Sequence, residues 1–216
     1  MKLLEELRSE HDLIDRVAAS LQAFAKLRRV REGDPRDGAG FLRFFRSFSG
    51  SYHHGREEET LFHILVQQAE LKPSGGPIGA LSDQHRWMAL TLERMAPLLP
   101  SDRPVDRENL LELAQRYTRA LWQHIDAENS VLLPESEERL HRCGVLELTG
   151  RAPSPEEAAA REAGERLLRA YPPVPDPEAI RGEGCVICLS YGTTCRGLER
   201  EWWNDYEWEA HVERDG

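Results

Sequence analysis

Apolar residues recur at every third or fourth position through four segments of the first 145 residues. Each segment therefore has the periodicity of an amphipathic helix, and none alternates as a half-buried strand would. Stretches rich in glycine and proline, at 31–40, 72–77 and 97–106, separate the segments and favour turns. The pattern predicts an all-α fold, an antiparallel up-down-up-down four-helix bundle over residues 1–145.

The pattern changes after residue 145. Residues 153–171 predict one more short helix with Pro155 in its first turn, and the proline-rich stretch 172–177 predicts a stiff linker. The last 33 residues carry three of the four cysteines and three of the five tryptophans. We therefore expect a short helix and linker at 146–183 and a small cysteine-rich module at 184–216.

The composition limits the classes of partner. A chain of 216 residues, 40% of them hydrophobic, is long enough to bury a core. The net charge of −10 and the pI near 5.4 disfavour a nucleic-acid-binding surface, which needs clustered lysine and arginine. No apolar run reaches the length of a membrane span, and the N-terminal residues are too charged for a signal peptide. We expect a cytoplasmic protein without nucleic-acid or membrane partners.

Six residues with metal-binding side chains fall on the apolar stripes of the predicted helices. A histidine and a glutamate four positions apart lie on one helix face, one turn apart. Two such pairs occur, in the second and fourth segments, and the first and third segments each contribute one histidine. The six residues are His11, His54, Glu58, His85, His124 and Glu128.

This arrangement repeats along the chain. Residues 54–62 and 124–132 share a His-x-x-x-Glu pattern that ends in two apolar residues, and each follows a helix with a single histidine. Such pseudo-symmetry favours two metal ions that share carboxylates. Buried carboxylates without partners would be very costly, and cations remove that cost. Imidazole and carboxylate without thiolate suit iron best, and manganese or zinc also fit.

Polar residues beside these six are given other roles. His53 lies one position off the stripe and is interpreted as a partner of a ligand or as a surface residue. His63 is expected to face solvent, and Glu57 and Glu59 to be surface charge. Tyr117 is expected to pack in the core, with a hydrogen bond to a metal-bound oxygen species as the alternative.

Four stretches together resemble the hemerythrin-like (HHE cation-binding) domain family, over residues 1 to about 145. They are EHDLID around His11, HHGREEETLF around His54, SDQHRWM around His85 and QHIDAENSVLLP around His124. The resemblance implies an up-down-up-down bundle that encloses a non-haem di-iron centre and meets O₂, NO or peroxide. Each of two iron ions would take two histidines, with Glu58 and Glu128 as bridging carboxylates beside an oxo bridge.

The match departs from the oxygen-carrying hemerythrins at two positions. Those proteins have a histidine where this chain has Ala89, and an aspartate where it has Asn129. A set of four histidines and two glutamates is more similar to the repair-of-iron-centres branch. Reversible carriage of O₂ is therefore not expected.

The C-terminal segment contains a Cys-x2-Cys-x6-Cys pattern, formed by Cys185, Cys188 and Cys195. Three thiolates at this spacing predict one zinc ion, which would hold so short a segment folded. A redox dithiol, an iron–sulfur cluster and free cysteines in a tail are competing interpretations. The excess of acidic residues disfavours DNA binding. The preferred fourth zinc ligand is His211, with Cys143 and Asp205 as alternatives.

The sequence supports three functions, in the following order. The first is binding and sensing of O₂, NO or iron redox status. The second is an enzyme that reduces NO or peroxide, or that donates iron for the repair of iron–sulfur clusters. The third is iron storage. A redox partner protein would accompany the enzymatic role.

Overall fold

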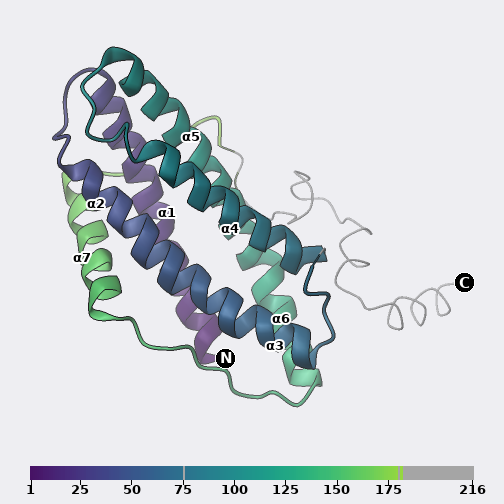
Figure 1. Cartoon of the computed structure of the whole chain (residues 1–216). Helices are drawn as coiled ribbons and strands as arrows, with labels where there is room; N and C mark the ends of the chain where they lie inside the picture. Colours follow the sequence, from purple (N-terminus) through teal and green to yellow (C-terminus); the bar gives the residue numbers. More distant parts are fainter. Residues whose placement is uncertain (75, 180, 182–216) are drawn as a thin grey trace, which may run out of the picture.

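The computed structural model describes residues 1–74, 76–179 and 181, and the secondary structure within them is helical, without strands. The expected all-α class is confirmed. In chain order the elements are α1 (Lys2–Arg29), α2 (Asp37–Arg43), the π-helices η1 (Phe44–His54) and η2 (Glu57–Phe62), α3 (His63–Gln68), α4 (Gly76–Met95), α5 (Pro104–Ala127), the π-helix η3 (Glu128–Leu132), α6 (Leu133–Arg142) and α7 (Pro155–Ala170) (Figure 1).

Several of these elements join into longer helices. The residues that connect α2, η1, η2 and α3 keep right-handed helical dihedrals, so residues 37–68 form one continuous helix. In the same way α5, η3 and α6 form a continuous helix over residues 104–142. These two helices lie side by side with α1 and α4 (Figure 1). The pair α1 and α5 is also joined by the Thr118 hydroxyl, which donates to the Ala18 carbonyl at 3.0 Å.

The hydrophobic core consists of two clusters. Each of the four long helices passes from one cluster to the other, and at least one histidine lies in or directly beside each passage. A layer of polar side chains therefore divides the core. The passages lie between Leu7 and Ile14, Tyr52 and Leu61, Leu81 and Met88, and Ile125 and Ala127.

The helix expected after residue 153 is confirmed as α7, with Pro155 in its first turn and a capping box of Ser154 and Glu157. It packs along α2, η1 and α1 (Figure 1). The approach is close, because a Cβ at Gly164 would overlap the Phe44 ring. The Ser20 hydroxyl of α1 donates to the Tyr171 carbonyl at 2.5 Å, just beyond the end of α7. The residues after 145 thus contribute a helix to the same packed body.

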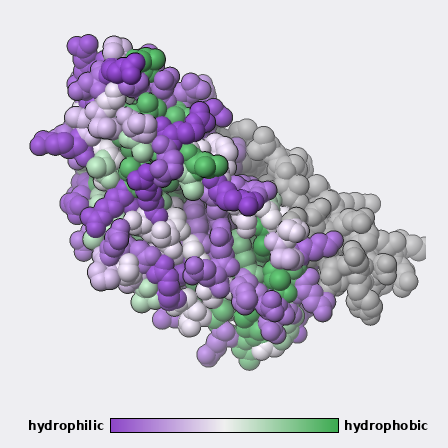
Figure 2. Space-filling model, viewed as in Figure 1, coloured by the Kyte–Doolittle hydropathy of each residue, from purple (hydrophilic) through white to green (hydrophobic). Residues whose placement is uncertain are grey.

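The surface fits this packing. On the face shown in Figure 2, hydrophilic side chains predominate over the described helices. None of these helices combines the length and apolar character that crossing a membrane requires.

Cys143 is an exposed free thiol. The predicted zinc ligands Cys185, Cys188, Cys195 and His211 lie outside the described residues.

Candidate metal centre

The π-helical turns of the helix over residues 37–68 determine which of its side chains face the centre. Between Phe44 and Glu57, pairs of buried residues recur every four positions, at 44/45, 48/49, 52/53 and 56/57, and His54 is buried beside the third pair. A π-helix bonds i to i+5 and has more residues per turn than an α-helix, so residues four apart stay on one face. This register keeps His53 and Glu57 inside the bundle, and π-helical turns of this kind are frequent at functional sites.

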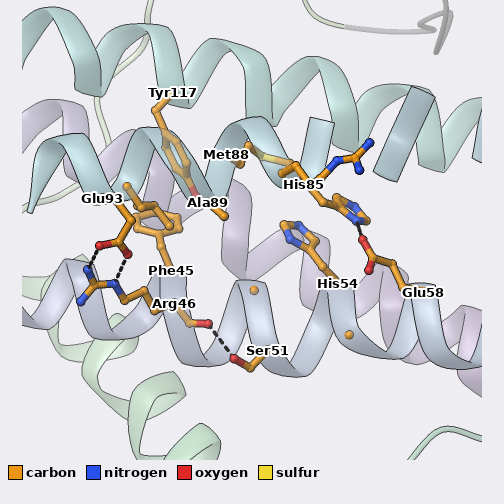
Figure 3. Close-up of a pocket in the computed structure, with 14 residues that line it drawn as sticks. Phe45, Arg46, Ser51, His54, Glu58, His85, Met88, Ala89, Glu93 and Tyr117 are labelled. Atoms are coloured by element: carbon orange, nitrogen blue, oxygen red, sulfur yellow. Dashed lines mark hydrogen bonds and ion pairs between the residues drawn. The ribbon is translucent and has the colours of Figure 1, made fainter. Parts of the chain in front are cut away.

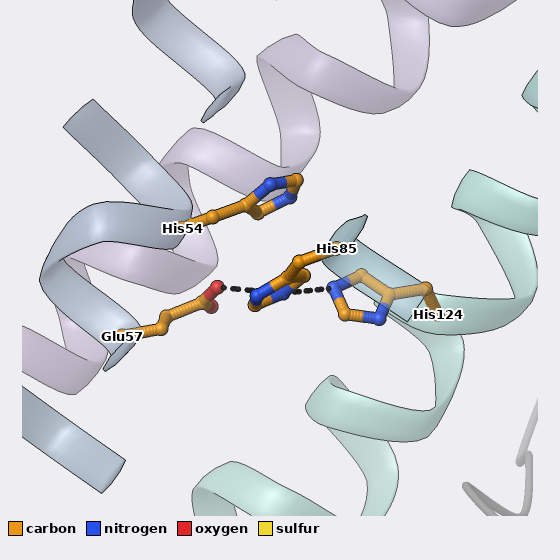
Figure 4. Close-up of side chains that lie close together, drawn as sticks. All are labelled: His54, Glu57, His85 and His124. Carbon is orange, nitrogen blue, oxygen red and sulfur yellow. Dashed lines mark hydrogen bonds and ion pairs between the residues drawn. The ribbon is translucent and has the colours of Figure 1, made fainter. Parts of the chain in front are cut away.

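Seven buried side chains converge in the polar layer and form two groups of potential metal ligands. In each group the candidate ligand atoms all lie within 4.8 Å of one another. Glu57 belongs to both groups. Figure 4 shows the first group, in which the histidines of three helices point toward one another and toward Glu57. The first group is His54, Glu57, His85 and His124; the second is His11, His53, Glu57 and Glu128.

The two glutamates lie between the groups. Glu57 Oε2 is 3.5 Å from His85 Nε2, while Glu57 Oε1 is 3.4 Å from His53 Nε2. Glu128 Oε2 lies 3.2 Å from Nε2 of both His11 and His124. Each carboxylate therefore faces one histidine of each group, as a ligand shared by two metal ions would.

Four of the five histidines are held by a hydrogen bond on the outer ring nitrogen, Nδ1. When Nδ1–H donates to an oxygen, the lone pair of Nε2 is left to face the centre. The chain thus fixes both the orientation of these rings and the nitrogen that they present. The pairs are His11 with Asn129 (2.8 Å), His53 with Glu10 (2.9 Å), His85 with Glu58 (2.7 Å) and His124 with Gln84 (2.7 Å).

The inner atoms of the centre fit a pair of cations. All four carboxylate oxygens of Glu57 and Glu128 are buried without a hydrogen-bond partner, and so is His54 Nε2. The Nε2 atoms of His85 and His124 face each other at 3.1 Å. Each buried acceptor without a partner destabilises the folded protein by about 1–3 kcal/mol. Cations placed among these atoms would satisfy them together, because every one is a metal-ligating atom.

Burial also changes the proton affinities in this layer. Burial, and then the neighbouring Glu128, raise the pKa of Glu57 to about 8. Burial lowers the pKa of His85 to about 3 and keeps that of His124 well below its ordinary value, so both rings are neutral and able to bind a metal. Burial alone would also lower the pKa of His11, but the adjacent carboxylates of Glu128 and Glu57 raise it to about 10. Without a cation, a proton on Glu57 and the positive charge of His11 therefore offset the charge of the two carboxylates.

The structure brings five of the six sequence-predicted ligands into the two groups. Glu58 is the sixth and lies outside them: its carboxylate is 46% exposed and accepts the His85 Nδ1–H. Glu57, which the sequence interpretation assigned to the surface, is fully buried at the shared position. His53 is also a member of a group, while His63 is exposed as expected. The signal that could have pointed to His53 and Glu57 is the four-residue spacing of the pairs that begin at Phe44 and Phe45.

A comparison with known families identifies the part of the chain that carries this site. The family model of the hemerythrin HHE cation binding domain matches residues 2–136, which is more than half of the chain. The chain belongs to the hemerythrin family. All seven clustered side chains of this hemerythrin domain lie within the matched residues. No curated protein and no solved structure shows a significant match to the chain.

The composition of the cluster differs from the set read off the sequence. The likeness to the repair-of-iron-centres branch rested on four histidines and two glutamates. In this hemerythrin domain five histidines and two glutamates come together, because His53 joins from the second helix. Ala89, where oxygen-carrying hemerythrins have a histidine, instead lines an open pocket beside His85.

Proposed function

We propose that this hemerythrin-like protein holds two iron ions and senses O₂, NO or iron redox status through a change in their oxidation state. The helices would be arranged as an antiparallel up-down-up-down four-helix bundle around them. One ion would take His54, His85 and His124, and the other His11 and His53. Glu57 and Glu128 would bridge the pair. The observation that carries the proposal is the set of four buried, unpartnered carboxylate oxygens between two groups of histidines.

The donor set is the argument for iron. Five imidazoles and two carboxylates offer no thiolate, and this combination suits iron, with manganese or zinc as competitors. Two iron ions would supply a reversible change of oxidation state and open positions for a small ligand. The chain's own part is to hold the ring nitrogens in place, to keep two carboxylates in a low-dielectric site and to exclude bulk water.

Enclosure favours sensing over storage. His11 and His53 are each 1% exposed. The Nδ1 of His11 is hydrogen-bonded to Asn129, and the Nδ1 of His53 to Glu10. A store must release its metal readily, and this degree of anchoring opposes release. An enzyme that reduces NO or peroxide is the second candidate, because a pocket reaches His54 and His85 from outside.

The test is the visible absorption of the chain after anaerobic loading with Fe²⁺, followed by admission of air. We expect new iron-dependent bands that persist when air is removed and disappear with added reductant. Bands that vanish on removal of air alone would indicate O₂ carriage and contradict the proposal. Steady consumption of reductant under NO or peroxide would establish the enzymatic alternative, and the absence of any iron-dependent band would refute the di-iron centre.

A further inference from the structure

A pocket of about 510 Å³ opens beside the centre, between η1 and η2 on one side and α4 on the other. Its inner end is formed by His54 and His85, which belong to the first ligand group (Figure 3). Its walls are largely apolar. They include Phe45, Met88, Ala89, Leu92 and Tyr117.

The size of the pocket identifies the class of occupant. A water molecule accounts for roughly 30 Å³ of liquid volume, and a diatomic gas is of similar size. Pockets that bind small organic molecules measure roughly 300–1,000 Å³. At about 510 Å³ this pocket is much larger than a diatomic ligand needs and matches a small organic molecule.

The charges in the wall are already paired with one another or with neighbours. Arg46 makes two hydrogen bonds to the Glu93 carboxylate, at 2.9 and 2.6 Å. Glu58 accepts from His85, and Arg86 pairs with Asp83. An ionised ligand would therefore find no unpaired counter-charge in the wall, and burying its charge there would be costly. The pocket favours a neutral molecule.

Tyr117 supplies one polar contact. Its hydroxyl points toward Ala89 and into the pocket (Figure 3). Within the described part of the chain the hydroxyl makes no hydrogen bond, although the ring packs edge-on against Phe45 at 5.1 Å. Burial raises the pKa of Tyr117, so the hydroxyl keeps its proton. It can therefore donate to an acceptor on a bound molecule.

We propose that this pocket binds a neutral, mostly apolar organic molecule with one hydrogen-bond acceptor, held by Tyr117 next to His54 and His85. This goes beyond the proposed function, because it adds an organic ligand to the O₂ or NO that the centre would meet; only the position of that ligand beside iron rests on the proposed function. As a statement about binding, it concerns residues of this chain alone and can be tested without metal.

The test is a titration of the metal-free full chain with cyclohexanone, which is neutral and has one acceptor. Ligand-observed NMR measures the binding. Ala89→Phe fills the pocket, and we expect it to weaken binding roughly tenfold or more, because the lost space removes most of the buried ligand area. Leu90→Phe is the matched control: it adds a ring at the next position of α4, where Leu90 is 66% exposed, and should leave binding unchanged.

Two further measurements sharpen the test. Tyr117→Phe removes one hydrogen bond and should weaken cyclohexanone binding by roughly two- to tenfold. Cyclohexanecarboxylate, of similar shape but charged, should bind much more weakly than cyclohexanone. Equal binding to the Ala89→Phe and Leu90→Phe variants, or equal binding of the anion, would overturn the proposal.

The metal content of the same proteins separates this inference from the proposed function. Loaded wild type and Ala89→Phe should contain the same amount of iron, because Ala89 belongs to neither ligand group. Iron uptake without cyclohexanone binding would refute the pocket alone. Cyclohexanone binding that depends on Ala89, in a chain that takes up no iron, would refute the metal centre and leave the pocket standing.

Discussion

The two halves of the centre differ in what lies behind their histidines. Behind His53, Glu10 accepts from the ring and pairs in turn with Arg56, which is 1% exposed and also pairs with Glu6 at 2.8 Å. The Arg56 guanidinium lies over the Tyr52 ring, 4.2 Å from its centroid. Behind His85, the half-exposed Glu58 accepts from the ring, and the pocket begins beside it. We call the half with His53 the closed half, because buried charge covers that histidine, and the half with His85 the open half; on its far side the closed half also has a pocket of about 460 Å³, lined by His11 and Asn129.

This difference suggests a division of labour. A closed half with a buried, compensated ion pair holds its ligands rigidly, since moving any member would leave a buried charge unpaired. An open half gives a small molecule a route to the centre. Glu57 and Glu128 contact histidines of both halves, so a change at the open half reaches the closed one through two shared carboxylates.

The largest effect is expected from Glu57→Gln, which removes the ligand common to both halves. We expect the iron content to fall from two ions per chain to one or none, because a neutral amide is a poor bridge between cations. Glu58→Gln is the matched control and should keep both ions. Elemental analysis of the loaded, desalted proteins measures this. If the two variants lose iron equally, or if only Glu58→Gln loses it, the shared role of Glu57 is wrong.

The two adjacent glutamates show where sequence reasoning succeeds and where it does not. In the helix over residues 104–142 the chain is α-helical up to Ala127, so the ordinary period correctly places His124 and Glu128 inside. In the helix over residues 37–68 the π-helical turns begin at Phe44 and shift the inward face by one residue before Glu57. The same His-x-x-x-Glu pattern therefore predicts the inward glutamate in one helix and misses it in the other.

Other features could be predicted only in part, for physical reasons. Helical periodicity is local and was sufficient for the all-α class and for the histidines on α1 and α4. The docking of α7 depends on a contact between Gly164 and Phe44, which are far apart in the sequence. The open pocket depends likewise on Ala89, whose small side chain is noteworthy only once its neighbours in space are known.

The next effect should come from the closed half. Arg56→Met removes the charge that compensates Glu10, so the orientation of His53 is no longer fixed. We expect affinity for one of the two iron ions to fall roughly 10–100-fold, with the other unchanged. Competition with a coloured chelator resolves the two affinities.

Two further variants serve as controls for this prediction. Arg46→Met breaks the Arg46–Glu93 pair at the mouth of the open half and should change neither affinity. Glu10→Met removes the acceptor of the His53 Nδ1–H, while Arg56 keeps its pair with Glu6, and should reproduce the loss. Weakening of both ions by Arg56→Met would show that the halves are not separately supported.

A smaller effect is expected where α7 packs on the helix over residues 37–68. Gly164→Ala places a methyl group against Phe44, at a distance that real Cβ atoms do not show. Alanine usually stabilises a helix by about 0.5–1 kcal/mol over glycine, but overpacking costs about 1–3 kcal/mol. The clash should win, and urea unfolding should show a net loss of stability. Glu162→Ala, at an exposed position of the same helix, serves as control; a more stable Gly164→Ala protein would mean that α7 is loosely docked.

The smallest effect concerns the start of α7. Arg151 binds the Glu157 carboxylate at 2.6 and 2.7 Å and, with the Ser154 backbone N–H, lowers the pKa of Glu157 to about 2. Because the folded pKa lies below the unfolded one, this contribution is full above about pH 5 and declines as the pH falls toward 2. Glu157→Gln should cost about 1 kcal/mol at pH 7 and less at pH 3, measured as the free energy of unfolding. A difference that stays constant between pH 7 and pH 3 would contradict the assignment.

The most direct test of the centre is the number of iron ions per chain in wild type, His53→Gln and His63→Gln. His53 lies in the closed half, and His63 is an exposed histidine ten residues further along the same helix. A centre built from two groups that share Glu57 predicts two ions in wild type, one in His53→Gln and two in His63→Gln. One ion in wild type, or two in His53→Gln, would contradict it.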